Sequence, residues 1–270
     1  MARSGLRGAS AEALAALTPR VEATSGDEAA QLGADLFGIA AVLRAEPSLR
    51  RVATDVSTDA AAKSGLVRQL FEGKVSGPAL DLLADAVERR WTATKDLADT
   101  LEDLGVVAVV RSAGDDADRL SDELFAVAQL IDEQSDLRVA LSDPARSAAD
   151  RSALLRQLIQ DRTLPATQRL AEQAIVGGHR TVGVALEEYQ KVAAAAHDRR
   201  VATVWVASEL TGADLERLQA ALSRQYDRQV HLNVIVEPQL LGGMRVEIGD
   251  DVIDGTVRGR LEDARRRLAG

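Results

Sequence analysis

The feature that most constrains the fold of this chain is an internal repeat with an offset of 88 residues. Sliding the sequence by that offset lays residues 27–87 over residues 115–175 without a gap. Two of the matched segments are LFGIA at 36–40 with LFAVA at 124–128, and SGLVRQL at 64–70 with SALLRQL at 152–158. A gapless match of this length predicts a duplication, so two copies of one structural unit fill most of the first 200 residues.

The apolar spacing inside the repeat is helical. Apolar residues recur at steps of four, three and four, at Leu32, Leu36, Ile39 and Leu43 and again at Leu120, Leu124, Val127 and Ile131. A stripe of this period covers one face of a helix that must pack on other helices. Aromatic residues make up only 3% of the chain, and the abundant Ala and Leu favour helix. Each copy is therefore predicted to be a helical bundle of roughly 90 residues.

Local signals place the helix starts and the connection between the copies. Asp59 and Ser147 stand at matched positions and are predicted to begin matched helices, with Asp150 completing a capping box after Ser147. The stretch 78–110 is expected to close the first bundle and to open the second, with no flexible linker between them.

The two copies differ at two positions in their inter-helix loops. Pro47 in the first copy corresponds to Ser135, and Val56 corresponds to Pro144 in the second. Proline fixes its own φ and restricts the residue before it. We therefore expect these loops to differ in shape between the copies.

The pattern changes after residue 200. Residues 201–207 are rich in β-branched side chains and predict a strand, residues 230–236 alternate apolar and polar side chains, and residues 244–253 predict a hairpin. Helices are expected from Thr211 and after Asp254. The predicted fold is mainly α with a C-terminal α+β module: two tandem duplicated helical bundles followed by a small sheet-plus-helix domain. The predicted domains are residues 1–96, 97–200 and 201–270.

Composition excludes several classes of function. The chain has no cysteine, which excludes disulfides, thiolate metal sites and cysteine nucleophiles and fits a reducing compartment. Its net charge of −9 argues against nucleic-acid binding. No window approaches the roughly 20 apolar residues of a membrane span, and Glu12 and Pro19 interrupt the apolar stretch that a signal peptide needs. We expect no direct membrane insertion, so any link to a membrane would run through a partner.

Glycines near the C-terminus resemble a phosphate-binding loop only superficially. Gly242, Gly243 and Gly249 precede strands rather than a helix, and no Lys follows them as a Walker loop requires. We interpret them as backbone positions that need a positive φ or a close approach between chain segments.

No catalytic constellation is found. The three histidines have no partners at metal-ligand or triad spacing: His179, His197 and His231. Asp254 is interpreted as a cap of the last helix rather than as a general acid. Trp205 is expected in a core, whereas Trp91 could lie in a core or at an interface. We predict no catalytic residue, no cofactor and no metal.

The segment 237–261, EPQLLGGMRVEIGDDVIDGTVRGRL, resembles the C-terminal signature of the ATP synthase delta subunit family, which includes the mitochondrial oligomycin-sensitivity-conferring subunit. Glu237 stands where Asp is common and Thr256 where Ser is common. The signature positions are Pro238, Leu241, Gly242, Gly243, Gly249, Asp254, Gly255, Thr256 and Leu261. The resemblance covers about residues 97–270, and the additional first bundle is similar to the enlarged actinobacterial members.

The resemblance implies a non-catalytic stator subunit of a bacterial F-type ATP synthase. Such a subunit links the catalytic head to the peripheral stalk at the cytoplasmic face of the plasma membrane. The implied partners are the N-terminal helices of the alpha subunits and the C-terminal region of the b-subunit. We expect residues 97–200 to hold the alpha-subunit helices, residues 201–270 to bind the b-subunit, and the first bundle to brace the side of the stalk.

Two other interpretations stay open at this point. A duplicated helical adaptor unrelated to ATP synthesis would explain the repeat but not the C-terminal signature. An enzyme that used the glycine turns to bind a nucleotide would lack the required Lys. The arginine-rich segment 258–267 is interpreted as a solvated helix face, with contact to an acidic stalk helix as the alternative.

Overall fold

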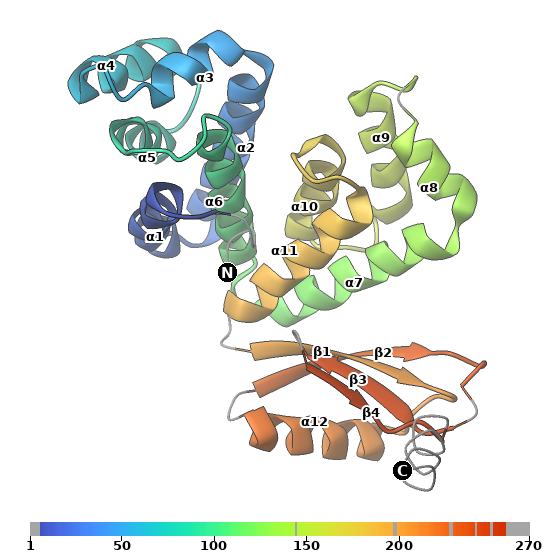
Figure 1. Cartoon of the computed structure of the whole chain (residues 1–270). Coiled ribbons are helices and arrows are strands. Elements are labelled where there is room, and N and C mark those ends of the chain that lie inside the picture. Colours follow the sequence, from blue (N-terminus) through green and yellow to red (C-terminus); the bar gives the residue numbers. More distant parts are fainter. Residues whose placement is uncertain are drawn as a thin grey trace, which may run out of the picture. The chain divides into compact units, whose positions relative to one another are not determined.

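The computed structural model describes residues 6–143, 145–196, 199–226, 229–240, 242–248 and 251–257. The chain divides into two compact units, Met1–Ala196 and His197–Gly270. The first consists of helices, and the second contains a sheet and a helix (Figure 1). The predicted fold class, mainly α with a C-terminal α+β module, is confirmed. In the part of the chain just given, no helix is long and apolar enough to cross a membrane.

The helices of the first unit follow the repeat. Those of the first copy are α1 (Ala9–Glu22), α2 (Gly26–Ala45), α3 (Pro47–Thr54), α4 (Ala60–Phe71) and α5 (Gly77–Glu88). Then come α6 (Asp96–Ser112), the short 3₁₀ helix η1 (Gly114–Asp116), α7 (Ala117–Glu133), α8 (Ser135–Ser142), α9 (Ala148–Ile159), α10 (Pro165–Val176) and α11 (Val182–Ala196). At an offset of 88, α2 to α5 match α7 to α10.

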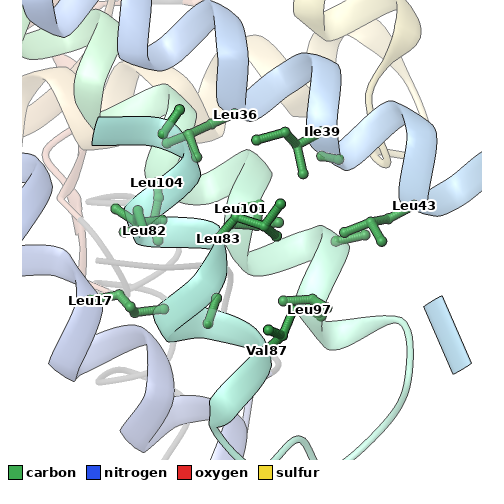
Figure 2. Packing of buried hydrophobic residues seen from close by; sticks show 14 of the residues in the cluster. Leu17, Leu36, Ile39, Leu43, Leu82, Leu83, Val87, Leu97, Leu101 and Leu104 are labelled. Carbon is green, nitrogen blue, oxygen red and sulfur yellow. The ribbon is translucent and has the colours of Figure 1, made fainter. Parts of the chain in front are cut away.

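Helix α6 belongs to both copies. It matches α1 at the start of the second copy, and α11 matches it at the end. Its residues Leu97, Leu101 and Leu104 pack in the first hydrophobic core with leucines from α1, α2 and α5 (Figure 2). Its residues Val106 and Val110 pack in the second core. One helix thus closes the first bundle and opens the second, and the division at residues 96 and 97 remains a prediction.

The expected helix starts are confirmed. The Asp59 carboxylate accepts hydrogen bonds from the backbone N–H groups of Ala61 and Ala62, at 3.0 and 3.3 Å. The Ser147 Oγ accepts one from the N–H of Asp150 at 3.0 Å. These bonds satisfy N–H groups that a helix leaves without internal partners.

The expectation that the inter-helix loops differ in shape is wrong where α3 and α8 begin, and it stays a prediction around Val56 and Pro144. Glu46 and Gln134, which precede α3 and α8, have φ, ψ of −115°, 82° and −105°, 94°. Asp55 and Asp143, which follow those helices, have −66°, 124° and −68°, 114°. Pro47 fits because the first helical position needs no N–H donor and has a φ near that of proline. The extended backbone of Asp143 already suits a following proline, although Pro144 itself lies outside the described residues.

Trp91, whose place the sequence left undecided, lies in the first core. Its side chain is buried, and its Nε1 donates a hydrogen bond to the carbonyl of Ala86 at 2.9 Å. A buried indole needs such a partner for its N–H group.

The second unit is a four-stranded sheet in the order β2-β1-β3-β4. Its elements are β1 (Arg199–Val206), α12 (Gly212–Tyr226), β2 (Gln229–Val236), β3 (Met244–Ile248) and β4 (Asp251–Asp254). Strands β1 and β2 are parallel and are connected through α12, whereas β3 pairs antiparallel with β1 and with β4. The core residues Ala202, Val204, Val230, Val246 and Ile248 pack with Leu222 of α12.

Trp205 was expected in a core and is only half-buried. Because side chains alternate along a strand, the burial of Val204 and Val206 turns Trp205 to the opposite face of the sheet. There the guanidinium of Arg245 lies 5.4 Å from the centre of its ring, a cation–π contact.

Candidate interaction sites

The glycine pair of the C-terminal signature lies where two chain segments meet. Gly242 and Gly243 have φ of +133° and +84°, which side chains rarely allow. A Cβ atom on Gly243 would lie 2.4 Å from the carbonyl oxygen of Gly255. Backbone hydrogen bonds join the segments, from Gly255 N to Met244 O at 2.9 Å and from Val257 N to Gly242 O at 3.0 Å. The glycines thus permit close contact between the turn before β3 and the turn after β4.

Asp254 organises the second of these turns. Its Oδ1 accepts hydrogen bonds from the hydroxyl of Thr256 at 2.7 Å and from the N–H of Thr256 at 2.9 Å. These bonds, the hydroxyl bond first, lower the pKa of Asp254, so the group is a poor proton donor near neutral pH. Its position suits a turn residue rather than a general acid.

The structure describes only some of the remaining signature positions. Pro238 is exposed in the turn after β2. Leu241, Gly249 and Leu261 lie outside the described residues, as does the expected last helix beyond Val257. The roles of the signature residues therefore stay predictions.

Histidine and carboxylate side chains form no metal-binding group of three or more in the described parts of the chain. The ring of His179 makes an edge contact with the ring of Tyr189, with 5.4 Å between their centres. His197 and the side chain of His231 lie outside the described part of the chain.

The two bundles expose different side chains at matched positions. In the second bundle, Val139 on α8 and Val176 on α10 are 67% and 49% exposed. The matched residues of the first bundle are Arg51 and Glu88. Single exposed apolar residues are common on protein surfaces, but an apolar residue in place of a charge at two matched positions distinguishes the copies. The first bundle exposes apolar residues elsewhere, among them Val56 at 75%, so the two bundles differ in where their apolar residues are exposed rather than in how many there are.

A buried carboxylate connects the two bundles, and the sequence analysis did not single it out. Glu102 of α6 has a fully buried side chain and pairs with Arg44 of α2. It also accepts hydrogen bonds from Gln173 Nε2 at 3.0 Å, Gly178 N at 3.1 Å and the Tyr189 hydroxyl at 3.3 Å. A buried charge is stable only when it is paired and hydrogen-bonded. Because these partners come from both bundles, the cluster fixes one bundle against the other. The only signal in the sequence is an acidic residue among the leucines and valines of this helix.

Comparison with known proteins gives a consistent result. The family model described as ATP synthase delta (OSCP) subunit matches residues 106–268. A Nocardioides protein named ATP synthase subunit delta is 60% identical over 99% of this chain and 98% of its own length. The Streptomyces coelicolor protein of the same name is 40% identical over 98% and 99%. A chain from a Toxoplasma gondii mitochondrial ATP synthase hexamer is 19% identical over 61% of this chain and 95% of its own, with a TM-score of 0.37, too weak a likeness to support an argument about assembly.

The family model and the relatives cover different parts of the chain. The family model begins inside α6, so α1 to α5 lie outside its match. The two bacterial relatives align over nearly the whole chain, so their matches include the residues that form these helices here. The first bundle is thus shared by these relatives but is not part of the family model.

Proposed function

Because the chain belongs to the ATP synthase delta (OSCP) subunit family, whose members are non-catalytic structural subunits of the F-type enzyme, we propose that it connects the catalytic head to the peripheral stalk. In this role it stops the head from turning with the rotor, so that proton flow drives ATP synthesis. The observation that carries the proposal is the match over residues 106–268, which spans the second bundle and the C-terminal unit together. As a peripheral part of the complex, the chain would lie at the cytoplasmic face of the plasma membrane.

The second bundle is proposed to bind the N-terminal helices of the alpha subunits. An amphipathic helix binds through an apolar stripe laid on an apolar surface. The family model covers most of the second bundle and leaves out α1 to α5, which supports this assignment, and the exposed Val139 and Val176 give such a helix apolar positions to contact.

The C-terminal unit is proposed to bind the C-terminal region of the b-subunit. It has its own hydrophobic core and forms a compact unit separate from the helices. A contact made by this unit should therefore be removable without unfolding the rest of the chain.

The first bundle is proposed to brace the side of the peripheral stalk. A stator part must resist torque, so its bundles should not rotate against each other. The shared helix α6 and the buried Glu102 cluster support such a connection. The two other interpretations are excluded by membership of the family: an unrelated adaptor and a nucleotide-binding enzyme.

Deletion of residues 197–270 tests the assignment of the stalk contact. The cut falls between the two compact units, and the remaining chain keeps both helical cores. Binding of a fragment from the C-terminal region of the b-subunit, measured by calorimetry, should be lost, while circular dichroism shows a folded helical protein. Normal binding of that fragment by the shortened chain would refute this part of the proposal.

A further inference from the structure

A groove runs along α6 between α1 and α11, all within the helical unit. The three helices lie side by side, with α6 in contact with both others (Figure 1). The groove has a cavity volume of about 600 Å³, and its lining on α6 includes Val106 and Val110, which are buried, and Val107, which is half-buried. This volume lies within the roughly 300–1,000 Å³ typical of ligand pockets.

Small residues form part of the groove lining on both sides. Ala11 and Ala15 line it on α1, and Ala195 and Ala196 line it on α11. Residues of α1 that line the groove recur at helical spacing, with Leu14 and Thr18 among them, so one continuous face of α1 forms this wall. The half-buried apolar residues Leu14 of α1, Val107 of α6 and Val192 of α11 line the groove, and one face of an α-helix whose apolar side chains recur at i, i+3, i+4 and i+7 would pack against them.

The charged residues along the groove are mainly acidic. Each helix contributes a carboxylate: Glu22 of α1, Asp103 of α6 and Glu188 of α11. The one guanidinium among the described lining residues belongs to Arg111, whose Nε donates a hydrogen bond to the carbonyl of Thr24 at 3.0 Å. Three carboxylates against one guanidinium favour a basic partner, and the net charge of −9 acts in the same direction.

The groove depends on the duplication. Helix α1 opens the first copy, α11 closes the second, and α6 belongs to both. The family model begins at residue 106, so the wall that α1 contributes lies outside it. Relatives that align over nearly the full length also span the residues of α1. The occupant should therefore be a partner of these long chains.

We propose that this groove binds one amphipathic helix of a partner protein, with an apolar stripe on Leu14, Val107 and Val192 and lysine or arginine residues beside Glu22 and Glu188. The proposal goes beyond the contacts with the alpha subunits and the b-subunit proposed above, none of which is assigned to this groove. Its test uses neither partner, so the two proposals can fail separately.

The probe is a synthetic 18-residue peptide of Leu, Ala and Lys with leucines at i, i+3, i+4 and i+7, labelled with fluorescein. A matched peptide carries Glu in place of Lys. Fluorescence anisotropy measures the binding of each to the full chain. We expect the Lys peptide to bind saturably and at least about tenfold more tightly than the Glu peptide, since the flanking carboxylates attract one and repel the other.

Charge reversal locates the site. The double variant Glu22→Lys and Glu188→Lys should weaken the Lys peptide at least about tenfold and strengthen the Glu peptide. The control variant Glu28→Lys and Glu72→Lys makes the same change of net charge at exposed positions outside the groove lining, and should alter binding by less than about twofold. Circular dichroism checks that both variants fold.

Three results would overturn the proposal. One is an absence of saturable binding by the Lys peptide. Another is equal weakening by both double variants, which would show attraction to the whole acidic surface. The third is saturable binding of laurate, abolished by Ala15→Trp, without binding of either peptide, which would make the groove a site for a small apolar ligand.

Discussion

Asp35 in the first bundle and Glu123 in the second occupy matched positions and make the same contact. Asp35 accepts a hydrogen bond from the N–H of Ser76 at 2.8 Å, and Glu123 accepts one from the N–H of Leu164 at 2.7 Å, each at the start of the fifth helix of its copy. Both carboxylates thus satisfy a backbone donor at a helix start. The duplication has kept the contacts that set the geometry within each bundle.

Other matched positions have diverged. Glu102, the buried carboxylate, corresponds to Gln190, which donates a hydrogen bond to the carbonyl of Ser121 at 3.4 Å. Gly33, where α2 meets α6 most closely, corresponds to Ser121. The comparison teaches that the copies share a backbone, whereas the residues on and around the shared helix α6 no longer match.

The largest effect is expected at Glu102. Glu102→Ala leaves the donors of Gln173 and Gly178 without their acceptor and reduces the partly buried Arg44 to its pair with Asp99, so it should lower the free energy of unfolding by about 3–5 kcal/mol. The matched change Gln190→Ala removes one long hydrogen bond and should cost about 1 kcal/mol. Urea unfolding of the full chain measures both. Equal losses would show that the two copies use this position alike.

A smaller effect is expected where α2 crosses α6. A Cβ on Gly33 would lie 2.6 Å from Val109 Cγ2 and 3.0 Å from the carbonyl oxygen of Gly105, so Gly33→Ala should cost about 1–3 kcal/mol. Gly38 lies on the same helix, and a Cβ there would meet no described atom within 4 Å. Gly38→Ala should therefore gain up to about 1 kcal/mol from helix propensity. Thermal unfolding compares the two, and a change of the same sign in both would contradict the close crossing.

Much of this comparison could be predicted from the sequence. The repeat, the stripe of Leu32, Leu36, Ile39 and Leu43, and the helix starts at Asp59 and Ser147 depend on local spacing, and all lie as expected. The C-terminal strands also follow local alternation. Such features depend on residues close together in the chain.

Three features could not be predicted in this way. The partners of Glu102 stand 58 to 87 residues away from it, so nothing near it in the sequence indicates the cluster. The face of the sheet on which the Trp205 side chain lies depends on which side of β1 packs against the core. The shape of the loop at Pro47 was misjudged because a conformation that proline permits is also open to Ser135.

The smallest effect concerns the loop after α3. The N–H of Ser57, then its hydroxyl, donates to Asp55 and lowers the pKa of that carboxyl. A lowered pKa in the folded state adds stability above the unfolded value of about 3.9, and this is lost as the pH falls through the folded value. Asp55→Ala should therefore flatten the pH dependence of the free energy of unfolding below about pH 4. Ser57→Ala, which keeps the backbone donor, should flatten it less, and an unchanged pH profile in Asp55→Ala would contradict the assignment.

The central claim is that the two bundles are not equivalent and that the second binds the alpha subunits. Expressing each bundle alone cannot test it, because a cut at residue 96 takes α6 out of the first core. Two variants of the full chain are compared instead, and in each of them three exposed apolar residues of one bundle are replaced by Asp. One set changes Val139, Leu158 and Val176 of the second bundle, and the other changes Val42, Val52 and Leu70 of the first.

The decisive measurement is calorimetric titration of a peptide from the N-terminal helix of the alpha subunits against these two variants and the unchanged chain. The account predicts that the aspartates in the second bundle weaken binding at least about tenfold, because charge on an apolar surface must be desolvated when the helix binds. Those in the first bundle should change it by less than about twofold. Loss caused only by the first-bundle set would reverse the assignment, and equal loss from both sets, or loss from neither, would contradict it.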